Sequence, residues 1–164
     1  LYLLRHAKAS PSADFNGDHE RPLAPRGVAA TERLTRYLDA HRAQPSVVLC
    51  SSARRTRETL AGIADGLHGD PDVTVDAGLY CASTEFLLQR VRRLPEDADS
   101  AMMIGHNPGL HSLATLLAGP DAATRLAAFP TGALVALDLS HEDWADVGEG
   151  SGAIADYVVP KELV

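Results

Sequence analysis

Short apolar runs alternate along the chain with stretches of helical periodicity. Four brief runs bounded by polar or turn residues are typical of buried strands, and they cover residues 1–4, 47–50, 73–75 and 101–104. A fifth run spans 133–139, and a weaker candidate spans 153–159. Strands that alternate with helices are typical of an α/β fold with a mainly parallel sheet. We therefore predict an α/β fold.

Four helices are predicted between these strands. Apolar residues at i, i+3, i+4 and i+7 form core-facing stripes in two of them. Ser83 and Thr84 are possible N-caps of another, which stops before Pro95. One helix is predicted from about 25 to 41 and another from about 84 to 94. The two apolar stripes span 60–67, in a helix whose first turn holds Arg54, Arg55 and Arg57, and 110–117.

Two polar stretches, residues 10–22 and 141–152, are predicted to be surface loops. A loop as long as the first is often functional in a compact domain. Trp144, in the second stretch, is expected to pack rather than to bind. His19, His41, His68 and His141 also fall in polar stretches and are predicted to lie at the surface.

The composition is that of an ordinary globular protein, with 45% hydrophobic and 23% charged residues among 164. Domains usually contain roughly 100–200 residues, so residues 1–164 are predicted to form a single domain. The formal charge of −7 opposes attraction to nucleic acid or anionic lipid. We therefore expect neither as a partner, and the composition leaves the oligomeric state open.

No apolar run approaches the ~18 residues of a membrane span. The apolar start is interrupted at Arg5, too early for a signal peptide, although a residue or two is expected to precede Leu1. A cytoplasmic location is therefore predicted. Cys50 and Cys81 are too few for a disulfide framework and lack metal-ligand spacing, so we predict that both are reduced.

Basic residues and histidines follow three of the predicted strands. Arg5 and His6 follow the first, Arg54 and Arg55 follow the second, and residues 105–108 (Gly-His-Asn-Pro) follow the fourth. Ligands of open α/β sheets bind at the carboxyl ends of the strands. Because guanidinium groups are permanently charged and match phosphate oxygens, these residues predict a pocket for a small anion, most naturally phosphate.

Each group also has a simpler explanation when taken alone. An Arg-His pair can be the polar end of a strand, and arginines in a first helical turn are usually solvated. His106 can be a hydrogen-bonded structural histidine, and Asn107 can cap a helix with Pro108 in its first position. The occurrence of three such groups at one sheet edge favours the functional interpretation.

Four motifs in this order resemble those of the histidine phosphatase superfamily, and in particular the short SixA-type phosphohistidine phosphatases. They are the Arg-His-Ala segment 5–7, Arg-Pro-Leu at 21–23 followed by Gly27, Ser-Ser-Ala-Arg-Arg-Thr-Arg-Glu-Thr at 51–59, and Gly-His-Asn-Pro-Gly at 105–109. The resemblance covers nearly the whole chain. It implies a phosphoglycerate-mutase-like fold with three α/β/α layers.

The resemblance also implies roles for individual residues. His6 would be a neutral nucleophile that attacks phosphorus, and Arg5 and Arg55, rather than Arg54, would neutralise the phosphoryl oxygens. His106, cationic once phosphate is bound, would stabilise the transition state, and Arg21 is a possible additional clamp. Since arginines and histidines supply the positive charge, no metal or other cofactor is implied.

The sequence departs from the family pattern at three positions. Ala7 stands where the family usually has Gly, and Ser52 stands where it has Pro. Ala24 stands where a Thr often caps the first helix, and the loss of that cap would cost about 1 kcal/mol. None of these changes affects the residues expected to bind phosphate.

The leaving group separates the possible substrates. A phosphate ester releases an alkoxide unless an acid protonates it, and larger members of the superfamily place a Glu shortly after the third strand. That position corresponds here to about Tyr80, and the nearest carboxylate, Glu85, falls in a predicted first helical turn. The absence of a clear acid favours phosphohistidine, and 164 residues leave little chain for a lid over a small substrate.

Three alternatives remain open. A small-molecule phosphomonoesterase would use Glu85, Asp14 or Asp18 as its acid, and its substrate would be a phosphorylated metabolite rather than a phosphorylated protein. A non-catalytic module would bind phosphate without turnover. A metal hydrolase would need His6, His106 and His111 as ligands, but the sequence lacks the usual ligand spacing.

Overall fold

The computed structural model describes residues 1–11, 15–122 and 124–163. It contains one six-stranded sheet in the order β3-β2-β4-β1-β5-β6. The strands are β1 (Tyr2–Arg5), β2 (Val47–Ser51), β3 (Asp72–Asp76), β4 (Ala101–Gly105), β5 (Leu134–Leu139) and β6 (Gly152–Val158). Strands β1 to β4 are parallel, and β5 and β6 are antiparallel to their neighbours. The predicted α/β class with a mainly parallel sheet is confirmed.

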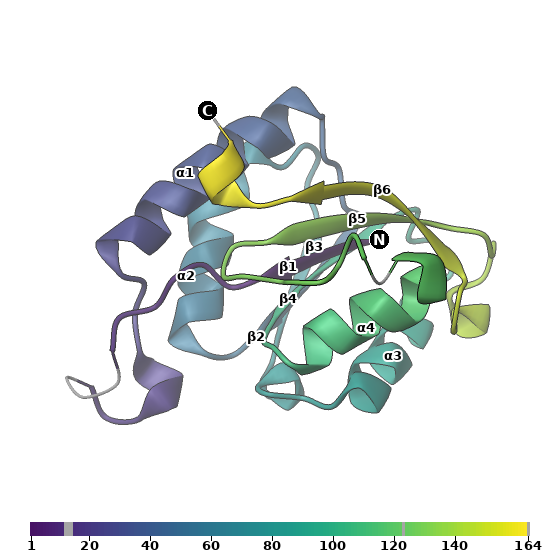
Figure 1. The fold of residues 1–164 in the computed structure, drawn as a ribbon, viewed down its shortest axis with the longest axis horizontal. Helices are drawn as coiled ribbons and strands as arrows, with labels where there is room; N and C mark the ends of the chain where they lie inside the picture. The colour runs from purple at the N-terminus through teal and green to yellow at the C-terminus, as the bar shows by residue number, and fades with distance from the viewer. Residues whose placement is uncertain (12–14, 123, 164) are drawn as a thin grey trace.

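Helices cover both faces of the sheet (Figure 1). They are α1 (Pro25–Ala40), α2 (Arg54–Ile63), α3 (Thr84–Arg92) and α4 (Gly109–Ala118). Side chains of α1 and α2 pack with Leu4, Val48 and Met102, whereas those of α3 and α4 pack with Leu3 and Met103. Because successive strand residues point to opposite faces, the sheet separates two apolar cores, and the three-layer prediction is confirmed.

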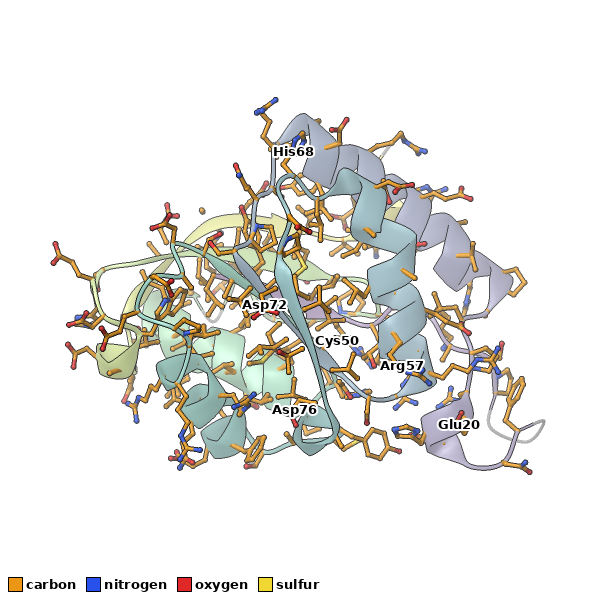
Figure 2. All side chains as sticks on the ribbon, turned by 180° about the vertical axis from the view of Figure 1, so that it is seen from behind. Glu20, Cys50, Arg57, His68, Asp72 and Asp76 are labelled. Carbon is orange, nitrogen blue, oxygen red and sulfur yellow. The ribbon has the colours of Figure 1, made fainter. Side chains whose placement is uncertain are left out.

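Two details of the sequence prediction are wrong. Residues 73–75 were expected to form a buried strand, but β3 lies at the edge of the sheet (Figure 2), where Val73 is 46% and Val75 51% exposed. The helical stripe was expected to reach Leu67, but α2 ends at Ile63 and a 3₁₀ turn follows. Gly66 in that turn lies so close to Thr35 that a Cβ would be 2.4 Å from its carbonyl oxygen.

Loops complete the structure at both ends of the sheet. The polar stretch before α1 contains a 3₁₀ turn at Asp18–Glu20. Trp144, expected to pack, contacts the core beneath α3 and donates a hydrogen bond from Nε1 to the Ala98 carbonyl at 2.8 Å.

Cys50 is buried and Cys81 exposed, and neither forms a disulfide. Across the described ranges, no helix combines the length and apolarity that crossing a membrane requires.

Candidate active site

Three parallel strands bring the predicted site residues together. The register pairs Arg5 of β1 with Gly105 of β4, so that His6 and His106 lie side by side where the strands end. The centroids of the two imidazole rings are 5.2 Å apart. Arg55 reaches the same point from the first turn of α2. They line a cavity of about 300 Å³ together with Arg5, Lys8, Ala9, Asp18, Arg21, Cys81, Asn107 and Thr131.

His6 presents one ring nitrogen to this cavity. Its Nδ1 lies 2.8 Å from the Ala7 carbonyl oxygen, which can only accept, so Nδ1 carries the proton and Nε2 keeps its lone pair. Burial, together with the charges of Arg55, Arg5 and Arg21, lowers the pKa of His6 to about 4, against the opposing effect of the Ala7 hydrogen bond. His6 is therefore neutral near pH 7, and its unprotonated Nε2, which accepts only a long hydrogen bond from Arg55 at 3.3 Å, is the nitrogen available for attack.

Arg55 contacts both histidines and Asp18, and it is only 4% exposed. It donates from Nε to His6 Nε2 and from Nη2 to His106 Nδ1, both at 3.3 Å. It also donates to the backbone carbonyl of Asp18 at 2.6 Å and to its carboxylate at 3.0 Å. Arg54, one position earlier, is instead exposed and pairs with Glu58 at 2.7 Å. The structure thus places Arg55, and not Arg54, beside the histidines.

Arg5 lies at the other side of the cavity. Its Nη1 donates to the Phe129 carbonyl at 2.9 Å. Its buried Nε has no hydrogen-bond partner among the described residues. Burial, followed by the charge of Arg55, lowers the pKa of this guanidinium from its ordinary value, but an arginine remains charged in proteins. An anion in the cavity would therefore meet the guanidinium groups of both Arg5 and Arg55.

Ser51, the last residue of β2, is hydrogen-bonded to the His106 ring. Arg55 can only donate, so His106 Nδ1 accepts and Nε2–H donates to Ser51 Oγ at 2.7 Å. Burial lowers the pKa of His106 to about 3, with smaller contributions from His6 and Arg55. The imidazole is thus neutral without a bound anion, and the cationic form expected from the sequence requires the added negative charge of phosphate.

The expected capping role of Asn107 is wrong. Helix α4 begins at Gly109 with Pro108 as its N-cap and has no side-chain cap. The Asn107 amide instead donates to the Phe129 carbonyl at 2.9 Å, the same oxygen that Arg5 contacts. Gly109 is required here because a Cβ would lie 2.1 Å from the Ala82 carbonyl oxygen. This segment therefore fixes the walls of the cavity around His106.

A single carboxylate, that of Asp18, lines the described part of the cavity. It accepts hydrogen bonds from the Tyr80 hydroxyl at 2.6 Å, from Arg21 at 2.8 Å and from Arg55 at 3.0 Å. The Tyr80 bond, and then those from the arginines, hold the pKa of Asp18 far below its usual range. Asp18 is consequently ionised and a poor proton donor. Arg21 also donates to the Ser10 carbonyl at 2.6 Å and lines the cavity as expected.

The other proposed acids lie elsewhere. Glu85 is exposed in the first turn of α3, where it accepts a hydrogen bond from Gln89 at 3.2 Å, and it does not line the cavity. Asp14 lies outside the described residues. The structure therefore does not bring Glu85 together with the histidines and arginines.

Sequence reasoning missed several members of the site. Ser51 closes β2 at the same edge as His106, and this position was a usable signal. Tyr80, which the sequence aligns with the Glu of the larger family members, packs edge-on against His106 with ring centroids 5.4 Å apart, and this contact had no signal in the sequence. His19, expected only at the surface, is hydrogen-bonded to Ser52 at 2.9 Å and lies edge-on against Tyr80.

Within the described residues, no group of three or more histidine, cysteine, aspartate or glutamate side chains could hold a metal ion. His111, the third proposed ligand, is hydrogen-bonded to the Leu126 carbonyl at 2.5 Å and stacks on Phe129. A larger cavity of about 600 Å³ lies at the opposite, amino ends of β1 and β4, far along the strands from the histidine pair.

Comparisons with known proteins agree over the length of the chain. The model of the Histidine phosphatase superfamily (branch 1) matches residues 1–80. An uncharacterised protein of Mycobacterium tuberculosis is 35% identical over 166 residues, covering 96% of this chain and 100% of that protein. Solved structures of candidate phosphohistidine phosphatases SixA from Nakamurella multipartitia and Agrobacterium tumefaciens are each 28% identical, with a TM-score of 0.83. They cover 97% of this chain, and it covers 95% and 96% of theirs.

Proposed function

Because the chain belongs to the histidine phosphatase superfamily, we propose that it hydrolyses phosphohistidine on a protein, without a metal ion, through a phosphohistidine intermediate at His6. The observation that carries the substrate choice is the state of Asp18. It is the one carboxylate of the described lining, and three donors keep it ionised. Such a site favours a leaving group that needs no strong carboxylic acid.

In the first step, His6 Nε2 attacks the phosphorus atom in line with the leaving nitrogen. The His6–phosphorus bond forms as the phosphorus–nitrogen bond of the substrate breaks, and the departing imidazole takes a proton from His106 or from solvent. Arg5 and Arg55 neutralise the phosphoryl oxygens as charge redistributes. In the second step, water attacks phosphorus as the phosphorus–His6 bond breaks, and the proton that water loses passes to His106 or to solvent. Inorganic phosphate is released, and neutral His6 is regenerated.

His106 fits the role of transition-state stabiliser. Its Nδ1 faces Arg55 and the cavity, while Ser51 fixes the opposite nitrogen. A bound phosphoryl group adds negative charge beside the ring and raises the pKa of His106. The protonated Nδ1 can then donate to an equatorial oxygen. Ser51 keeps the ring in the orientation that this contact requires.

The similar proteins support the same substrate class. The two SixA structures that match over nearly the whole chain carry the description of phosphohistidine phosphatases. The chain also lacks a long insertion between β3 and α3 that could enclose a small substrate, because only residues 77–83 separate the two elements. A cavity open to solvent admits a side chain presented by another protein.

Three substrates test the proposal in the presence of a chelator: a histidine-phosphorylated peptide, an alkyl phosphate ester and p-nitrophenyl phosphate. The nitrophenolate leaves without a proton, whereas the alkoxide needs an acid. We expect wild type to cleave phosphohistidine best and the alkyl ester worst, and His6→Ala to cleave none of them. Preferred turnover of the alkyl ester would replace the proposal by a small-molecule phosphomonoesterase. Binding of phosphate without any turnover would indicate a non-catalytic module.

A further inference from the structure

The cavity that contains His6, Arg55 and His106 is called the phosphate pocket below. A second cavity, of about 370 Å³, adjoins it. The two share Lys8 and Thr131 in their linings. The second cavity, which we call the basic groove, runs from Lys8 along α1 to the C-terminal 3₁₀ turn Pro160–Glu162, which packs against α1 (Figure 1). Anything that extends from a group bound in the pocket can therefore enter the groove directly.

The charged residues of the groove are all cations. They are Lys8, Arg26, Arg33 and Lys161, with no acidic residue in the described lining. In the described part of the chain none of the four forms an ion pair. This concentration of positive charge occurs in a protein whose formal charge is −7. The groove consequently extends the positive charge of the adjoining histidine-containing cavity along α1, in a protein that is acidic as a whole.

Arg26 occupies its position against the local preference of the helix. It lies in the first turn of α1, which contains no acidic residue. A cation there is disfavoured by the helix dipole, typically by about 0.3–1 kcal/mol. The helix dipole therefore does not account for a cation at this position, which leaves the Arg26 charge available to an anion in the groove.

We propose that the basic groove binds an acidic segment next to the phosphohistidine of a protein substrate, an inference that rests on the proposed function. Arg26, Arg33 and Lys161 are exposed on long side chains. Such side chains attract carboxylates spread along a flexible segment, whereas a single small anion needs buried, fixed donors. Lys8 joins the groove to the pocket, so one substrate can occupy both.

The test uses two synthetic peptides with one histidine each, flanked either by aspartates or by serines, and phosphorylated chemically on that histidine. Wild type, Arg26→Glu and Arg33→Glu are compared with Arg93→Glu, which makes the same charge change at the exposed C-terminal end of α3 on the other face of the sheet. The readout is the ratio of kcat/KM for the acidic peptide to kcat/KM for the neutral one.

For wild type and Arg93→Glu we expect a ratio of about ten at low salt, and for the two groove variants a ratio near one. Raising the salt from about 50 mM to about 500 mM lowers the wild-type ratio, because exposed charges are screened. Equal ratios in Arg33→Glu, Arg26→Glu and wild type overturn the proposal. The same proteins are also assayed with fructose 1,6-bisphosphate, a small bisphosphate. Loss of its hydrolysis in the two groove variants, with unchanged peptide ratios, would assign the groove to a small anion and overturn the proposal. If wild type cleaves neither peptide, the proposed function fails first and the docking proposal falls with it.

Discussion

Arg55 links the two histidines, because it is within hydrogen-bond distance of a nitrogen on each ring. The Asp18 carboxylate, 3.0 Å from Arg55, balances its charge. Both histidines are neutral near pH 7, so the positive charge that meets a phosphoryl group comes from the arginines. At the scale of residues, the proposed catalysis thus depends on fixed guanidinium groups beside an uncharged nucleophile.

Exchanging neighbouring arginines tests this role. We expect Arg55→Ala to lower kcat/KM by about 10²–10³, the usual cost of losing a donor to transition-state charge. Arg54→Ala should change kcat/KM less than about twofold, since an exposed ion pair such as that with Glu58 contributes little. Steady-state kinetics on the phosphohistidine peptide make the comparison. Equal losses in the two variants would mean that Arg55 has no special role.

Acid stability tests the burial of the histidines. The pKa is about 4 for His6 and about 3 for His106 in the folded protein, whereas a histidine of the unfolded chain has a pKa of about 6.5. Between these values the unfolded state binds more protons, so the free energy of unfolding falls as pH falls. We expect the Tm of wild type to drop more between about pH 7 and about pH 4.5 than the Tm of His6→Gln. Parallel curves for both proteins would contradict this.

At the scale of elements, strand ends position the chemistry and helix starts complete it. Strands β1, β2 and β4 deliver His6, Ser51 and His106 to one edge of the sheet. Thr59 joins α2 to the segment after β1, because its hydroxyl accepts from Ala7 N at 3.0 Å and donates to the Arg55 carbonyl of its own helix at 2.6 Å. The site is therefore built on rigid elements rather than on loops alone.

Two helix caps give matched predictions of opposite sign. Ala24 is the N-cap of α1 and offers no side-chain hydrogen bond, whereas Ser83 caps α3 by accepting from Phe86 N at 3.2 Å. We expect Ala24→Ser to raise the free energy of unfolding, and Ser83→Ala to lower it, each by about 1 kcal/mol. Urea denaturation measures both. A change of the same sign in the two variants would show that capping does not control these helix ends.

The sequence predicts the central elements better than the borders. Apolar runs locate the strands because burial on both faces demands them, but they do not distinguish a central strand from the edge strand β3. Motif order identifies Arg55 among three nearby arginines. It does not identify the contacts of Asp18 with Arg55 and Tyr80, because these depend on how the loop before α1 folds over the sheet edge.

At the scale of the whole molecule, charge is distributed unevenly. The protein carries a formal charge of −7, yet the described linings of the histidine-containing cavity and the adjoining basic groove hold five arginines and two lysines against one acidic residue, Asp18. This contrast directs anions to one edge of the sheet while the remaining surface repels them. It is also how an acidic protein would recognise the phosphorylated and acidic partner that we propose.

The most direct test of the central claim is to label the intermediate. A phosphohistidine peptide carrying ³²P is mixed with wild type or His6→Ala, the reaction is quenched in alkali within milliseconds, and the labelled residue is identified by mass spectrometry. The account predicts transient, acid-labile phosphate on His6 Nε2 of wild type and no label in His6→Ala, whose Tm should show a folded protein. Turnover by His6→Ala, or label on a residue other than His6, would contradict the account.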